Sequence, residues 1–227
     1  MVKFDEYKVE IEFVKPVVGA LPKNKEVLQT WIESRGKKSG KTPPEIQELI
    51  EKIGDEVGAT DEAEKRWTGF KTDEKGIYLE DRNIKAMLRE AATTLEAFKG
   101  TGSVARRQTF QHGLFIEPAR IRFFRNGGII TEPEDVQERA IHVMTALGPR
   151  STLKKEDIVN PGAHMRWNIL VVVPGGRESA HITMKMLEDW LTLGQKIGLG
   201  GSRSQGYGQF MIREFSEGRW SADEVFL

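Results

Sequence analysis

The sequence predicts a mixed α+β fold with a core in the order strand, helix, strand, strand, helix, strand. Three patterns support this: apolar alternation over 7–14, amphipathic helical spacing over 82–99 and 181–197, and a nearly continuous apolar strand over 166–173. The chain has 227 residues, of which 38% are hydrophobic and 30% are charged. This composition can form a buried core and is unlike that of a disordered chain.

The first strand is predicted over residues 7–14, because apolar and charged residues alternate there and Pro16 follows. The apolar side comprises Tyr7, Val9, Ile11 and Phe13. The stretch 19–81 lacks strong strand patterns and is predicted as a helical insertion, with helices over 25–34 and 45–57. Residues 45–81 include twelve acidic and five basic residues. A solvated acidic face is the simplest interpretation of this charge.

The first core helix is predicted over 82–99, with Asp81 as its N-cap and Gly100 beyond its end. Lys85 and Arg89 are four residues apart on it and share one exposed stripe. Its apolar face comprises Ile84, Met87, Leu88, Ala91, Ala92, Leu95 and Phe98.

A second strand with a kink at Pro118 is predicted over 113–124, with Arg120 and Arg122 on one face. A polar excursion rich in glycine and proline follows over 125–165, and an excursion of this length is usually functional or mobile. The apolar run 166–173 is expected to be a central strand.

The second core helix, over 181–197, leads into a glycine-rich stretch and a last strand over 210–215. Without its insertions, the predicted order is that of the ferredoxin-like fold. RNA-recognition domains share this order, and so do many unrelated proteins.

The stretch 198–208 (GLGGSRSQGYG) is the sharpest chemical feature, with five glycines in eleven residues. Glycine permits positive φ and a close approach of the backbone to a ligand, so successive N–H groups can hold a phosphate. The stretch follows a helix and precedes a strand, which excludes both the nucleoside-triphosphate P-loop and the dinucleotide fingerprint. A glycine C-cap with a tight turn is the alternative, but a plain turn rarely needs this many glycines together with an arginine.

The sequence resembles the RAMP superfamily of CRISPR-associated proteins. GLGGSRSQGYGQF resembles the glycine-rich loop that these proteins carry near the C-terminus, and 78–92 (YLEDRNIKAMLREAA) resembles their first-helix motif. Ala86 stands where the family usually has glycine. The length and the excursion are most similar to those of the crRNA-coating backbone subunit of Class 1 effector complexes, of type III, type I or a type IV-like system.

The resemblance implies a single RAMP domain over 1–227, in which 19–81 is an insertion and 125–165 a thumb-like excursion before the third core strand. The implied partners are crRNA and its complementary target, copies of the same chain arranged head to tail, and other effector subunits. The implied function is interference with viruses or mobile elements. The residues expected to bind RNA are Lys85, Arg89, Arg106, Arg107, His112, Arg120, Arg122, Arg125, Arg139, Arg150, Gly200, Gly201, Ser202, Arg203, Ser204 and Gln205.

The charge pattern is consistent with RNA binding, because nine basic and three acidic residues lie between 82 and 125. Phe110 and His112 are candidates for stacking on bases. A solvated surface is the simpler interpretation of each arginine taken alone. The acidic insertion of one copy facing the basic surface of the next would favour a filament.

No catalytic residue, metal site or cofactor is predicted. No two histidines have metal-ligand spacing, and the chain has no cysteine. The aspartate of target-cleaving type III backbone subunits has no clear counterpart here. Two alternatives stay open: a RAMP-type RNA endonuclease acting on crRNA precursor or target RNA, and a protein-assembly module without RNA contact.

Lys and Arg together equal Asp and Glu at 34 each, which excludes a strongly basic nucleic-acid binder but not a local basic surface. The absence of cysteine excludes a disulfide scaffold and a cysteine nucleophile. No long apolar run or secretory signal is found, so a cytoplasmic protein with no membrane partner is expected.

Overall fold

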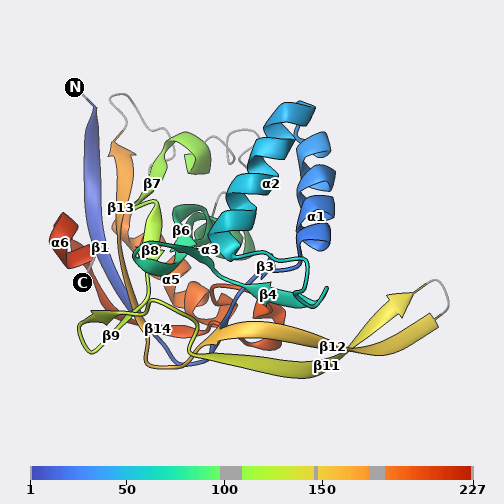
Figure 1. The fold of residues 1–227 in the computed structure, drawn as a ribbon. Coiled ribbons are helices and arrows are strands. Elements are labelled where there is room, and N and C mark those ends of the chain that lie inside the picture. The colour runs from blue at the N-terminus through green and yellow to red at the C-terminus, as the bar shows by residue number, and fades with distance from the viewer. Residues whose placement is uncertain (1, 98–108, 146–147, 174–181, 226–227) are drawn as a thin grey trace. The chain divides into compact units, whose positions relative to one another are not determined.

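The computed structural model describes residues 2–97, 109–145, 148–173 and 182–225, which form a mixed α+β fold (Figure 1). The chain divides into two compact units. The first comprises 1–17, 78–130 and 161–227, and the second comprises 18–77 and 131–160. Strands β2 (Val17–Val18) and β6 (Gly76–Glu80) cross the boundaries between them.

The first unit contains an antiparallel sheet in the order β10-β9-β13-β1-β14, in which β7 also pairs with β13. Along the chain its elements are β1 (Lys3–Phe13), α3 (Asp81–Thr94), β7 (Leu114–Glu117), β8 (Arg120–Arg122), β9 (Phe124–Arg125), β10 (Gly128–Ile129), β13 (His164–Val173), α5 (Met184–Ile197), η1 (Arg203–Gln205), β14 (Phe210–Glu217) and α6 (Ala222–Val225). Strand β13 pairs with β1 on one side and with β7 and β9 on the other, which confirms its predicted central place.

One face of this sheet is covered by α3 and α5. The residues of β1 that were predicted to be apolar and inward are buried: Tyr7, Val9, Ile11 and Phe13. The helices contribute Met87 and Leu88 from α3 and Trp190 from α5, all fully or almost fully buried. Gly194 permits close packing of the two helices, since a Cβ there would lie 2.3 Å from Sδ of Met87.

The first core helix differs from its prediction at both ends. It begins at Asp81, and Glu80, still extended at φ −82° and ψ 151°, takes the N-cap position. Asp81 therefore lies in the first turn, where its charge still suits the helix dipole. The helix ends at Thr94, before the glycines that were expected to stop it, and positions 98 and 99 lie outside the described residues.

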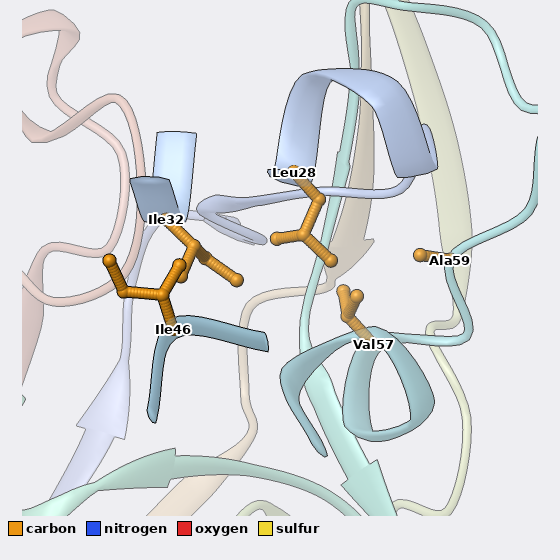
Figure 2. Close-up of a cluster of buried hydrophobic side chains, with 5 residues drawn as sticks. All are labelled: Leu28, Ile32, Ile46, Val57 and Ala59. Atoms are coloured by element: carbon orange, nitrogen blue, oxygen red, sulfur yellow. The ribbon is translucent and has the colours of Figure 1, made fainter. Parts of the chain in front are cut away.

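The second unit contains α1 (Lys25–Lys38), α2 (Pro43–Val57) and a sheet in the order β11-β12-β4-β3, off which β2 pairs with β12. Its strands are β3 (Leu21–Pro22), β4 (Trp67–Gly69), β5 (Lys71–Asp73), β11 (Asp135–Thr145) and β12 (Gly148–Val159). Figure 2 shows the small core between the two helices, made of Leu28, Ile32, Ile46, Val57 and Ala59.

Both helices predicted in the insertion are confirmed, but its strands were missed. Strands β3, β4 and β5 have two or three residues each, too short for a period-two pattern to be recognised. Strand β6 has five residues, but four successive ones are buried, so no alternation marks it. The excursion over 125–165, in which no long strand was predicted, contains β11 and β12, which pair continuously from Asp135 and Ile158 to Thr145 and Gly148. This two-stranded ribbon is the longest feature of the second unit (Figure 1).

No helix among the described residues is both long and apolar enough to cross a membrane.

Candidate nucleic-acid interface

The glycine-rich loop is fixed at its base by backbone contacts that only glycine permits. The N–H of Gly198 donates to the Gly194 carbonyl at 2.8 Å, and the N–H of Leu199 donates to the Gly208 carbonyl at 3.0 Å. At Gly208, with φ +68°, a Cβ would lie 1.8 Å from the Leu199 oxygen. These contacts hold the two ends of the loop, Leu199 and Gly208, close together between α5 and β14. We call this closed base of the loop its neck.

Beyond this neck, the tip of the loop leaves backbone donors available. Ser202 lies in the left-handed region at φ 53°, and the short helix η1 follows it. Within the described chain, the N–H groups of Gly200 and Gly201 donate to no acceptor. Both residues are partly exposed, and the side chains of Ser204 and Gln205 are exposed beside them. Two successive free N–H groups suit an anion.

An ion pair joins the loop to helix α3. Nη1 of Arg203 donates to Oε2 of Glu90 at 2.9 Å, and the two residues are 113 positions apart in the sequence. Arg89 precedes Glu90, is exposed, and forms no ion pair with any residue that the structure describes. The structure thus brings the two motifs that carry the family resemblance to one place on the first unit.

Lys85 lies one helical turn before Arg89 and is half-buried. Its Nζ lies 5.2 Å from the ring centre of Phe115, a cation–π distance. Burial of the amine lowers the pKa of Lys85, and the nearby Asp81 carboxylate opposes this shift. Lys85 and Arg89 were predicted to share one exposed stripe of the helix, but they differ in exposure. Arg89 is exposed, whereas Lys85 is half-buried.

Arg120 and Arg122 share one face of β8, as predicted. Their guanidinium carbons lie 5.2 and 5.0 Å from the ring centre of Tyr78. Arg122 is only 4% exposed, whereas Arg120 is exposed. Arg120 is thus the more accessible of the two to a ligand.

The remaining predicted residues of the first unit are spread more widely. Arg125 donates to the Pro161 carbonyl at 3.0 Å, and His112 is exposed. Arg106 and Arg107 lie outside the described residues. Phe110, expected to stack on bases, is buried and packs on Trp190 with 5.3 Å between ring centres. That expectation was wrong, because the ring belongs to the core.

In the second unit, Arg139 lies at the base of the β11–β12 ribbon. Its Nε donates to Oε2 of Glu156 at 2.8 Å, and Gln137 donates to the same oxygen at 3.0 Å. Lys154 also pairs with Glu156, which is fully buried. Arg150 lies on β12 opposite Val143, and its side chain is outside the described set.

Two residues of this candidate interface, Glu90 and Phe115, were not identified from the sequence. Glu90 holds Arg203, and nothing in the sequence links positions so far apart. Phe115 is 40% exposed between buried Leu114 and Ile116. The alternation of this strand, with its helix-facing residues at even positions, was the signal that could have identified Phe115 as an outward aromatic residue. Within the described ranges, no three His, Asp or Glu side chains gather as metal ligands.

Comparison with known proteins gives one structural likeness to report. No protein-family model matches the chain, and no curated protein matches it. Among solved structures, it is similar to a chain of a type III-B Cmr-β complex bound to cognate target RNA, with 16% identity and a TM-score of 0.49. The likeness covers 96% of this chain and 61% of that chain, so this chain spans about three fifths of the other's length.

Proposed function

We propose that this protein binds guide RNA as the backbone subunit of a CRISPR effector ribonucleoprotein, in several copies arranged head to tail along the spacer. The first unit would be the ferredoxin-like RAMP core, since β1, α3, β7, β13, α5 and β14 follow that order with antiparallel neighbours. The second unit would combine the insertion with the thumb.

The observation that carries this proposal is the contact between the glycine-rich loop and α3. Arg203 pairs with Glu90, the residue after Arg89 on α3, so the contact joins this helix to the loop in which the N–H groups of Gly200 and Gly201 donate to no acceptor in the described chain. Backbone N–H groups with arginine bind phosphate without reading base identity. A protein that coats guides of any sequence needs this kind of contact.

The β11–β12 ribbon supports the assignment of a thumb. It is a long antiparallel hairpin whose base is fixed by the buried Glu156 with Arg139, Gln137 and Lys154. A ribbon held this firmly could separate short segments of the guide–target duplex. In such a complex, base pairing by the guide reads the target sequence, and the protein needs no catalytic group.

The proposal is tested by titrating single-stranded RNA with purified protein at several salt concentrations. We expect salt-sensitive binding, with a weaker affinity and a shallower salt slope for Arg89→Ala. Lys185→Ala is the matched control, because Lys185 lies at the opposite end of α5 from the loop and is also exposed. Absence of RNA binding by the wild-type protein would overturn the proposal.

A further inference from the structure

Two large aromatic side chains lie exposed on the sheet of the first unit. Phe4 on β1 is 42% exposed and Phe115 on β7 is 40% exposed. Their ring centres are 6.2 Å apart at an interplanar angle of 80°, an edge-to-face contact. Leaving two such rings in water forgoes apolar burial, so the arrangement needs a reason other than stability.

Strand register explains why these rings point away from the core. Phe4 pairs with Val172, and Phe115 pairs with Leu170, two residues along the same strand β13. Directly paired residues share a face, so both rings lie on one side of the sheet. The neighbours of Phe115, Leu114 and Ile116, are buried on the other side, which the helices cover.

Lys85 reaches Phe115 because, among the described strands, β7 pairs with β13 alone, so that its other side is an edge of the described sheet. The amine lies over the ring at 5.2 Å and forms no ion pair with any described residue. An exposed aromatic ring and a neighbouring amine, which also has the Asp81 carboxylate nearby, match the two parts of one nucleotide, a base and its phosphate.

The charges around the two rings favour one direction for an RNA strand. Glu6 and Glu117 both pair with Arg219. The pocket that Phe4 lines also contains Asp5, Glu6, Tyr7 and Glu217. Burial, and then the charges of Asp5 and Glu217, raise the pKa of Tyr7, which indicates a negative potential in that pocket. A phosphate is therefore favoured on the Lys85 side of Phe115 and disfavoured on the Phe4 side.

We propose that Phe115 is a stacking platform for one unpaired base of the bound RNA, and that Lys85 contacts the phosphate next to that base. Phe4 supports the platform by its edge contact with the Phe115 ring. This inference rests on the proposed function and adds to it a base contact outside the glycine-rich loop. Stacking on an aromatic face tolerates any base, as a guide-coating protein requires.

The test measures the dissociation constant for a single-stranded RNA across a salt series, in the full-length protein and four variants. Phe115→Ala and Phe115→Leu should weaken binding about five- to a hundredfold, while Phe115→Trp should retain it. Because stacking releases no counterion, the salt slope of the Phe115 variants should equal that of the wild type. Lys85→Ala should reduce the slope by about 0.7, the value for one phosphate of a single strand.

Met184→Ala is a control, since Met184 is similarly exposed at the start of α5. If the wild-type protein binds RNA and Phe115→Leu binds it with the same affinity, the proposed stacking role of Phe115 is overturned. The proposed function is left intact by that result. Such a result would reassign the aromatic pair to a protein partner. A wild-type protein that binds no RNA overturns the proposed function itself.

Discussion

Nη1 of Arg203 on the glycine-rich loop lies 2.9 Å from Oε2 of Glu90 on helix α3. The side chains are 34% and 50% exposed, so the pair contributes little to stability, about 0–1 kcal/mol. Its consequence is positional, because it ties the loop tip to the part of α3 that follows Arg89. It also places one carboxylate where a phosphate is expected to bind.

Glu90→Gln should therefore strengthen RNA binding. The substitution keeps an amide oxygen that can accept from Arg203, so the loop tip stays tied to α3. It removes a negative charge that repels phosphate, an effect of about 1 kcal/mol near the surface, or about fivefold in affinity. Glu48→Gln, at an exposed position of α2 in the second unit, should change nothing. Equal or weaker binding by the Glu90 variant would contradict the phosphate site.

The lowered pKa of Lys85 gives a pH prediction with a definite sign. Burial disfavours the charged amine, so its contribution to RNA binding is present below its pKa and is lost as the pH rises through that value. Lys85→Arg should bind RNA with less alkaline loss, because arginine stays protonated. Binding curves from neutral to alkaline pH provide the comparison, and parallel curves for the two proteins would argue against the role of Lys85.

Gly208→Ala should destabilise the loop far more than Gly206→Ala. Both residues have positive φ, but a Cβ at Gly208 meets the Leu199 oxygen at 1.8 Å, whereas nothing lies within 4 Å at Gly206. The expected costs are about 1 kcal/mol at Gly206 and at least 3 kcal/mol at Gly208. Thermal unfolding of the two variants measures the difference, and similar melting temperatures would show that the neck can relax.

The sequence predicted the helices and long strands of the first unit well, because their apolar periods are regular. The alternating apolar residues of β1 are buried as expected, and so are five of the residues predicted on the apolar face of α3: Ile84, Met87, Leu88, Ala91 and Ala92. The prediction was wrong for Leu95, which is 46% exposed just after the helix ends at Thr94. The glycine-rich loop was also identified, since the number of glycines exceeds the needs of a turn. The N-cap of α3 was misplaced by one residue, as Glu80 and Asp81 are both acidic and only the backbone angles distinguish them.

Contacts between segments that are distant in the sequence could not be predicted from it. The ribbon β11–β12 is polar on most positions and shows little alternation. Its pairing with β4 joins Lys155 to Trp67, far apart in the sequence. The same holds for Arg139, predicted as an RNA contact and observed at 2.8 Å from buried Glu156. A single sequence gives no signal for such pairs.

Glu156→Ala should therefore destabilise the ribbon. The substitution removes the buried carboxylate that accepts from Arg139, Gln137 and Lys154, at a cost of about 3–5 kcal/mol. Glu138→Ala is a matched control at an exposed position of β11 and should cost less than about 0.5 kcal/mol. Denaturant unfolding of both variants measures this, and a small effect at Glu156 would show that the network does not hold the ribbon base.

The central claim is that copies of this chain line up along a guide RNA. The most direct measurement is the mass and the nucleic-acid absorbance of particles purified after co-expression with repeat–spacer RNAs of two spacer lengths. The account predicts RNA-containing, nuclease-sensitive particles whose mass rises with spacer length by whole protein copies. A nucleic-acid-free monomer with either RNA would contradict it.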